Sequence, residues 1–184
     1  MDVNQTAETK YPEYQKIKRL NRDCSITEKI DGTNALILVS EDGTVKAGQR
    51  TKWVPWPNGP DNYGFAQWVE AHKEELRQLG PGLHRGEWFG AGIQRGYGLT
   101  EKRFALFLPP KDGLIPACCS LVPTLYKGPF STETVANYVE ILRRNGSVAV
   151  PGYMNPEGVV VFHEAIGFLA KVTLQNDDKP KGAP

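Results

Sequence analysis

Short apolar runs separated by polar turns recur along the chain, a pattern typical of a protein built largely from β-strands. Where apolar residues alternate with polar ones or form runs of four to eight, strands are predicted. These segments lie near residues 25–30, 34–40, 44–50, 82–89, 102–108, 147–150, 158–163 and 167–173. The segment Glu41-Asp42-Gly43-Thr44 predicts a tight hairpin between the second and third strands.

Two segments have the apolar spacing of a helix that packs on one face. The first, 62–79, ends at Gly80-Pro81, and the second, 132–144, begins at Ser131 or Thr132 and ends at Asn145-Gly146. Many strands that are joined by short turns, with few helices, predict an α+β fold. We therefore expect mostly antiparallel sheets flanked by helices.

Length and composition favour one globular domain. The chain has 184 residues, of which 40% are hydrophobic, and lacks the roughly 20 consecutive apolar residues that a membrane span needs. The first residues, MDVNQTAETKYPEYQ, contain no apolar segment typical of a secretory signal. We expect a cytoplasmic protein without a membrane partner, with a core at about 11–174 and a polar tail at 175–184.

The cysteines, histidines and charges exclude some classes of function. Cys24, Cys118 and Cys119 show no C-x-x-C spacing and the three histidines are isolated, so reduced thiols are expected and a transition-metal site is not. A net charge of +1 argues against a uniformly basic surface but allows a local one. Basic patches of this kind are more often solvated surface than phosphate contacts. Those visible in the sequence are Lys16-Ile17-Lys18-Arg19, Arg143-Arg144, Lys179 and Lys181.

One polar interruption of the strand pattern calls for a chemical explanation. In ITEKIDGTNALILV, residues 26–39, the dipeptide Asp31-Gly32 is a turn signal, but Lys29 comes two residues earlier at the end of a predicted strand. A lysine there is either a surface residue or a nucleophile. An amine attacks phosphorus only in its unprotonated form, which burial and neighbouring cations favour.

The order of the motifs after this lysine carries a family resemblance. The segments are Lys29-Ile30-Asp31-Gly32-Thr33-Asn34, Arg50, Gly86-Glu87-Trp88-Phe89-Gly90, Phe104-Ala105-Leu106-Phe107, Glu157-Gly158-Val159-Val160-Val161 and Lys171-Val172-Thr173. From about Tyr11 to Lys181 this order resembles the covalent lysyl-AMP nucleotidyltransferases, which include ATP-dependent RNA and DNA ligases and mRNA capping enzymes. Asn34, the segment Gln49-Arg50-Thr51 and Gln94 resemble most closely the phage-type RNA ligases that seal nicks in duplex RNA.

The resemblance implies a fold, an activity and roles for individual residues. It implies the ATP-grasp-like core of ligases and capping enzymes, and an RNA ligase that uses ATP and Mg²⁺ (or Mn²⁺) to join RNA ends. Lys29 would be the nucleophile and Glu157 the principal metal ligand, assisted by Asp31. The expected nucleotide-binding residues are Glu28 (backbone, adenine edge), Asn34, Arg50 and Gln94 (ribose and phosphates), Glu87 (ribose hydroxyls), Phe107 (adenine stacking) and Lys171, which lies across from Lys29.

Two positions depart from the family pattern. Ligases commonly have a second lysine where this chain has Thr173, and Lys179 and Lys181 are candidates to replace its charge. Many relatives have Asp where this chain has Leu108. We expect a single nucleotidyltransferase domain over 1–184 without an appended C-terminal domain, so that gripping the second nucleic-acid end falls to this domain or to a partner protein.

Other functions remain open from the sequence. A DNA ligase or a GTP-using capping enzyme is an alternative enzyme, and a non-catalytic nucleotide- or nucleic-acid-binding module is an alternative of another class. The Gly-rich stretch 90–98 misses the dinucleotide fingerprint by one residue, and a loop crossing the nucleotide pocket explains it better. The sequence leaves open RNA or DNA ends, nicks or single-strand ends, the preferred metal, the pathway and the oligomeric state.

Overall fold

Two sheets form the framework of the computed structural model, which describes residues 13–175, 177 and 178. Sheet A has the strand order β7 (Thr124–Pro129), β1 (Asp23–Lys29), β8 (Gly158–His163) and β9 (Phe168–Thr173), all antiparallel. Sheet B has the order β3 (Val45–Gln49), β2 (Thr33–Val39), β4 (Gly82–Gly90), β5 (Lys102–Leu106) and β6 (Cys119–Leu121). Only the β5–β6 pair is parallel among these described strands, which confirms the expected α+β class.

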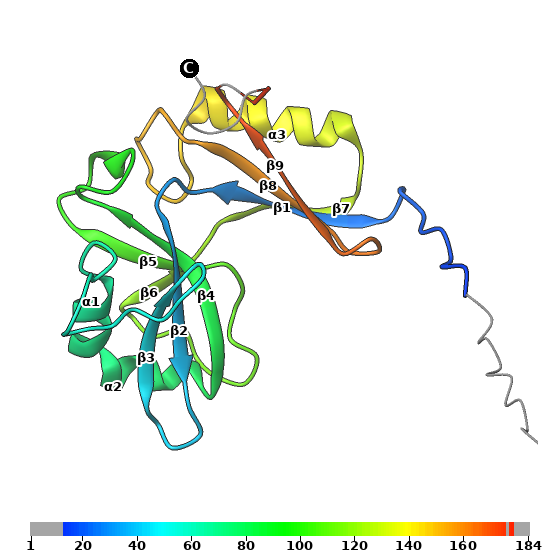
Figure 1. The fold of residues 1–184 in the computed structure, drawn as a ribbon. Coiled ribbons are helices and arrows are strands. Elements are labelled where there is room, and N and C mark those ends of the chain that lie inside the picture. Colours follow the sequence, from blue (N-terminus) through cyan, green and yellow to red (C-terminus); the bar gives the residue numbers. More distant parts are fainter. Residues whose placement is uncertain (1–12, 176, 179–184) are drawn as a thin grey trace, which may run out of the picture.

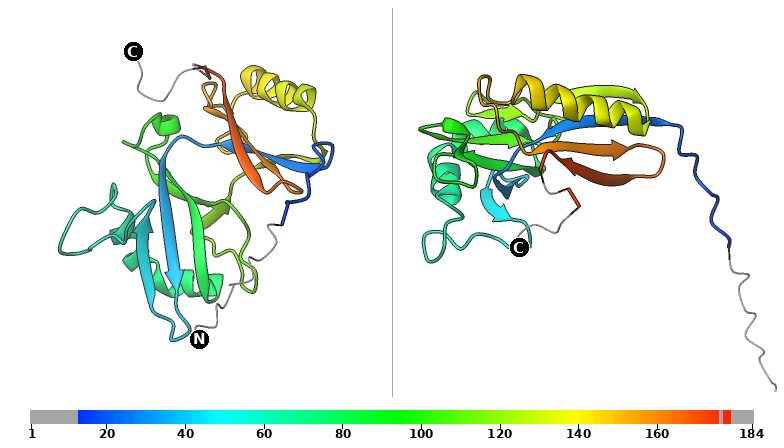
Figure 2. Two further views of the ribbon diagram at one scale, coloured as in Figure 1. Left: turned by 45° about the vertical axis from the view of Figure 1, so that its right-hand side comes forward. Right: turned by 90° about the horizontal axis from the view of Figure 1, so that it is seen from above.

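Helices cover one face of each sheet. α1 (Phe65–Ala71), α2 (Lys73–Leu76) and the short 3-10 helix η1 (Arg77–Leu79) pack on sheet B, and α3 (Thr132–Asn145) lies along sheet A (Figures 1 and 2). A further 3-10 turn, η2, spans Gly96–Gly98. In the part of the chain that the structure describes, no helix is long and apolar enough to cross a membrane.

The opposite faces of the two sheets are not covered by these helices. Apolar side chains of β2 and β4 alternate toward the helix-covered side, where Ala35, Ile37 and Trp88 pack with Phe65 and Val69. The polar side chains between them, including those of Asn34 and Glu87, therefore point to the open face. Since β1 of sheet A continues directly into β2 of sheet B, the two open faces adjoin one another where the chain crosses over (Figure 1).

Some predicted elements differ from the structure. The helix predicted at 62–79 begins only at Phe65, because Asn62, Tyr63 and Gly64 have positive φ (43°, 60° and 84°), and it breaks at His72. The strand predicted at 147–150 is wrong, since this segment is a turn whose N–H groups bind a carboxylate instead of a strand. Strands β6 and β7 were missed because they are short or contain glycine and proline. The tail lysines Lys179 and Lys181 lie outside the described residues.

Gly158 shows how closely the strands of sheet A approach at the crossover. This residue has φ +155°, and a Cβ added to it would lie 2.1 Å from the carbonyl oxygen of Val172 and 2.8 Å from Cα of Thr173. A side chain therefore cannot fit unless β8 and β9 separate. The first residue of β8 is a glycine because the paired strand occupies the space of any side chain.

A comparison of two glycine substitutions tests this crowding. Gly158→Ala should lower the free energy of unfolding by about 1–3 kcal/mol more than Gly167→Ala does, because overpacking adds to backbone strain. Gly167 also has positive φ (73°) but nothing within 4 Å of an added Cβ, so it reports the strain alone. The measurement is urea unfolding of both variants, and equal losses would contradict the crowding argument.

Candidate active site

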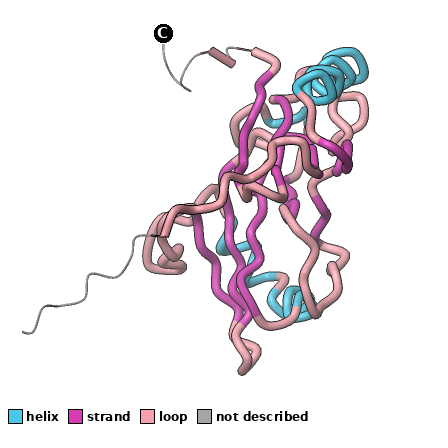
Figure 3. The backbone as a smooth tube through the Cα atoms, turned by 90° about the vertical axis from the view of Figure 1, so that its right-hand side faces the viewer, coloured by secondary structure: helices cyan, strands magenta, loops and turns pink. Residues whose placement is uncertain are grey.

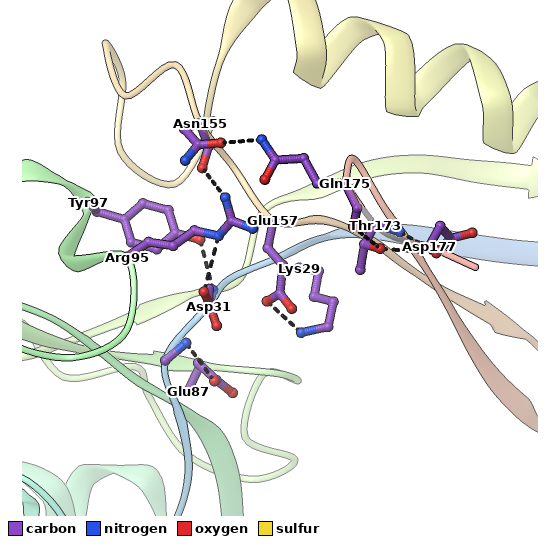
Figure 4. Close-up of polar contacts among 11 residues, drawn as sticks. Lys29, Asp31, Glu87, Arg95, Tyr97, Asn155, Glu157, Thr173, Gln175 and Asp177 are labelled. Atoms are coloured by element: carbon purple, nitrogen blue, oxygen red, sulfur yellow. Dashed lines mark hydrogen bonds and ion pairs between the residues drawn. The ribbon is translucent and has the colours of Figure 1, made fainter. Parts of the chain in front are cut away.

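Lys29 lies at the end of β1, where the chain leaves sheet A for sheet B. Its Nζ is 2.6 Å from Oε2 of Glu157, the residue that precedes β8, and the lysine and glutamate side chains are 22% and 7% exposed (Figure 4). Lys29 is in register with Gly158, the first residue of β8. The structure therefore brings together the expected nucleophile and the expected metal ligand, 128 residues apart in the chain.

Gly32 allows sheet B to begin directly beside this pair. A Cβ at Gly32 would lie 2.4 Å from the carbonyl oxygen of Trp88 and 3.0 Å from Cγ of Glu87. The bare backbone instead donates its N–H to Oε1 of Glu87 at 3.0 Å. At the predicted Asp-Gly turn, the backbone of the crossover thus lies in close contact with β4. This contact holds the Glu87 carboxylate on the same side of sheet B as Lys29.

Glu87 is an acid whose protonation is sensitive to this environment. The pKa of Glu87 is raised from its ordinary value to about 7, chiefly by burial. Lys29 and the Gly32 N–H oppose this rise, and the carboxylates of Glu157 and Asp31 contribute to it. The four side chains therefore interact electrostatically across the junction of the two sheets. A ligand that donates hydrogen bonds or positive charge here favours the ionised form of Glu87.

Two residues that were not assigned from sequence hold Asp31. The Tyr97 hydroxyl accepts a hydrogen bond from the backbone N–H of Asp31 at 2.8 Å, and Nε of Arg95 lies 3.1 Å from its Oδ2. Arg95 also donates to the carbonyl of Asn155 at 3.2 Å, two residues before Glu157 (Figure 4). The Gly-rich loop thus connects the crossover to the segment before β8 that contains Asn155 and Glu157. The only signal in the sequence for this role was the position of the loop between the motifs.

Glu28 has a structural partner that the sequence did not reveal. Its buried carboxylate accepts hydrogen bonds from the Ser147 hydroxyl (2.6 Å) and from the N–H groups of Val148 and Ala149 (2.8 Å each). Its own N–H donates to the carbonyl of Pro123 at 3.0 Å, so this donor is not available to a base edge. The side chain of Glu28 therefore anchors the turn after α3, and its expected contact with adenine stays a prediction.

The open face of sheet B carries several of the other expected residues. Asn34 is the cross-strand neighbour of Glu87, and its Oδ1 is buried without a hydrogen-bond partner. Arg50 follows β3 by one residue and is exposed, and Phe107, which is 39% exposed, follows β5 and donates its N–H to the Arg85 carbonyl. An unpaired buried acceptor and an exposed ring on the same sheet face suit a ligand with hydroxyl groups and a flat base.

The remaining expected residues are Lys171 in sheet A and Gln94 in the Gly-rich loop. Lys171 is exposed on β9 opposite Val160, while Thr173 is the residue that lies in the same cross-strand row as Lys29, through Gly158. The N–H and Oγ1 of Thr173 are 2.7 and 3.2 Å from Oδ1 of Asp177, so a carboxylate lies beside the position where ligases commonly have a second lysine. Gln94 is exposed at φ 47°, outside this cluster.

The carboxylates of this site can supply only part of the coordination shell of a divalent cation. Among the described residues, no group of three or more His, Cys, Asp and Glu could hold a metal ion by itself. Mg²⁺ is commonly bound by one or two carboxylates, with substrate phosphates and waters completing its shell. Glu157 and Asp31 fit that partial role, and a fully protein-bound metal centre does not fit this site.

Comparisons with known proteins agree with the fold. The family model described as RNA ligase matches residues 22–173. A Naegleria gruberi RNA ligase mutant with ATP and Mn has 17% identity and a TM-score of 0.60 over 87% of this chain and 52% of that chain. The same ligase with PPi has 16% identity and a TM-score of 0.59 over 86% and 53% of the two chains. No curated protein matches the sequence.

The similarities cover the whole of this fold but only part of the similar proteins. The chain spans about half the length of the solved structures that it matches. At such low identity, the structural likeness shows a shared fold, while the family match rests on the sequence itself. The matches do not distinguish the phage-type branch, which stays a prediction.

The raised pKa of Glu87 predicts a pH effect on stability. Between the pKa of an unfolded glutamate, about 4.3, and about 7, the folded protein keeps a proton that the unfolded chain releases. The free energy of unfolding should therefore fall as pH rises through this window, by an amount on the order of 1–3 kcal/mol from this residue.

The variant Glu87→Gln isolates this contribution, because glutamine keeps the shape and cannot ionise. The free energy of unfolding is measured with urea between pH 4 and 8 for the nucleotide-free parent protein and for the variant. As pH rises, the stability of the parent should fall relative to that of the variant. Parallel profiles for the two proteins would mean that Glu87 titrates normally.

Proposed function

This chain belongs to the RNA ligase family, and we propose that it is an ATP-dependent RNA ligase that acts through a covalent lysyl-AMP intermediate. The observation that carries the proposal is the Lys29 amine, held 2.6 Å from Glu157 where two open sheet faces adjoin. Around it are a raised-pKa acid, Glu87, and a buried acceptor without a partner on Asn34. A surface lysine in a turn would have none of these neighbours.

In the first step, Lys29 would attack the α-phosphorus of ATP. A bond forms between Nζ and phosphorus, the bond from that phosphorus to the bridging oxygen breaks, and pyrophosphate leaves with the electron pair. The ammonium must first lose a proton, and Glu157 Oε2 is the carboxylate oxygen that accepts its hydrogen bond. A bound Mg²⁺ or Mn²⁺, held by Glu157 with Asp31, would offset charge on the phosphates.

The other expected residues would position the nucleotide. Phe107 would stack on adenine through its exposed ring, and Glu87 and Asn34, neighbours across β4 and β2, would bind the ribose hydroxyls. Arg50 and Lys171 are exposed cations on the two sheets that would contact phosphates, and Gln94 would approach from the Gly-rich loop. Structures of the similar Naegleria ligase with ATP and Mn support this choice of nucleotide and metal class.

Two further steps would complete the reaction on RNA. The 5′-phosphate of one RNA end attacks the phosphorus of lysyl-AMP, which frees Lys29 and forms a 5′–5′ pyrophosphate-linked AMP. The 3′-hydroxyl of the other end then attacks the 5′-phosphorus, forms the phosphodiester and releases AMP. The family match favours RNA over DNA ends and ATP-using ligation over guanylyl transfer, while nicks or single-strand ends and any gripping partner remain proposals.

Substitution of the nucleophile tests the first step. Lys29→Arg and Lys29→Ala should both lose all covalent AMP while keeping the fold, because arginine keeps the charge but cannot be deprotonated to attack. Intact-protein mass spectrometry after incubation with ATP and Mg²⁺, or with GTP in parallel, measures the adduct. A variant that still gains AMP would show that another residue is the nucleophile.

The division of labour between metal and base binding predicts two different defects. Glu157→Ala should abolish adenylylation at any ATP concentration, because proton transfer and metal binding both depend on that carboxylate. Phe107→Leu should mainly raise the ATP concentration required, since stacking on a base is worth about 1–3 kcal/mol. An ATP titration of the adenylylation rate distinguishes the two, and losses in Phe107→Leu that excess ATP cannot restore would contradict the stacking role.

A further inference from the structure

The open face of sheet B carries a cross-strand row that no single segment of the sequence reveals. Leu36 on β2 pairs with Gly48 on β3 and with Arg85 on β4. Gly48 forms an isolated bridge with Trp53, and at the other edge Phe107 donates its N–H to the Arg85 carbonyl. Residues paired across antiparallel strands share a face. The row therefore runs from Trp53 to Phe107, with Arg85 between them.

Trp53 lies on this face because residue 48 has no side chain. A Cβ added to Gly48 would be 3.1 Å from Cε3 of the Trp53 ring and 3.3 Å from two side-chain carbons of Leu36. The ring therefore occupies the position of the missing side chain and extends the sheet surface beyond β3. It is nevertheless 49% exposed, so a large part of the indole is open to a ligand.

Three exposed cations lie in or beside the row on the same face. Arg85 belongs to it, Lys46 pairs with Leu38 one row toward the β2–β3 hairpin, and Arg50 follows β3 at the end nearest Glu87. Within residues 13–175, none of the three forms an ion pair or a side-chain hydrogen bond, although Asp42 lies near enough to Lys46 to feel its charge. Glu87 is the only carboxylate in the paired rows of this face.

We propose that this face, defined by Trp53, Arg85 and Lys46, is a docking surface for single-stranded RNA next to the end that is joined. The proposal rests on the proposed ligase function, which places the activated nucleotide at the Phe107 edge of the same row. Exposed aromatic and guanidinium planes stack on unpaired bases, which a duplex keeps inside its own stack. The cations attract the phosphates.

The dimensions of the row fit this occupant. Neighbouring strands lie about 4.7–4.9 Å apart, so the four intervals from Trp53 to Phe107 span roughly 19 Å. An RNA strand entering at the Trp53 edge would therefore pass Arg85 and reach the site edge within a few nucleotides. The strands run side by side in Figure 3, which looks from the side opposite α1.

The experiment measures binding of a 5′-phosphorylated single-stranded RNA oligonucleotide by fluorescence anisotropy, without ATP, over a salt series. Trp53→Ala should weaken binding at least about fivefold, from the lower end of the stacking energy per base, and Trp53→Phe should restore part of it. Arg85→Ala should reduce the slope of log K against log salt by about 0.7, the value for one contact to a single strand.

Matched controls come from the same protein. Trp56→Ala removes a second exposed tryptophan (41%) of the same loop that is not part of the row, and Arg144→Ala removes an exposed arginine of α3. Both should bind the oligonucleotide as the parent protein does. Thermal unfolding of each variant shows whether it is folded, and a blunt RNA duplex of the same sequence should bind more weakly than the single strand.

Self-adenylylation separates this inference from the proposed function. The Trp53 and Arg85 variants should form lysyl-AMP at the parental rate, because the row residues tested are not part of the nucleophile's surroundings. The docking surface is contradicted if the Trp53 and Arg85 variants bind RNA as the parent does, or if the control variants lose as much binding as they do. It is also contradicted if the duplex binds as tightly as the single strand. If the parent binds RNA as described but gains no AMP, the ligase function is wrong and the surface stands.

Discussion

The passage of the chain from sheet A to sheet B at Gly32 is the constraint on which the site depends. A side chain there would collide with the backbone of β4, as the 2.4 Å separation from the Trp88 carbonyl shows. The close approach places the end of β1, with Lys29, beside the strand that carries Glu87. Gly158 imposes a second close approach, between β8 and β9. Gly32 therefore brings together strands that are distant in sequence, and Gly158 allows the consecutive strands β8 and β9 to pair closely.

Charge balance within this junction follows from the same geometry. Glu157 is paired with Lys29 and Asp31 with Arg95, so two buried carboxylates have cationic partners. Glu28, on the other face of β1, is compensated by a hydroxyl and two N–H groups. Glu87 receives one backbone N–H and is left with a raised pKa. Its ionisation is therefore sensitive to what binds beside it.

The sequence was sufficient for the fold class, because strand periodicity is a local signal. Lys29 and Glu157 were singled out by the resemblance to a family, but their contact was not predicted and their roles stay predictions. The helix at 132–144 was predicted to within a residue, since its Ser131 cap and Gly146 end are local as well. The roles of Arg95 and Tyr97 were missed because both depend on a loop returning to Asp31, over 64 and 66 residues. Segment 147–150 was misread as a strand, since its apolar composition does not show that Glu28 binds its N–H groups.

The same long-range pairing explains why Arg85, Lys46 and Trp53 could not be grouped from the sequence. Charge runs such as Lys16–Arg19 are visible by eye, whereas cations on different strands become neighbours only when the register is known. A net charge of +1 therefore says little about any one face of the protein.

The hydrogen bonds of Glu28 have a mechanical consequence for its neighbour. Adjacent residues of a strand share a peptide bond while their side chains point to opposite faces. The Glu28 carboxylate is hydrogen-bonded to the turn that follows α3. Any displacement of that end of the helix must therefore either break three hydrogen bonds or move the backbone of Lys29 with it. The position of the Lys29 amine therefore depends on α3, although α3 packs on the opposite face of sheet A. A molecule that binds to the α3 side of sheet A would change the reactivity of Lys29 through the backbone of β1.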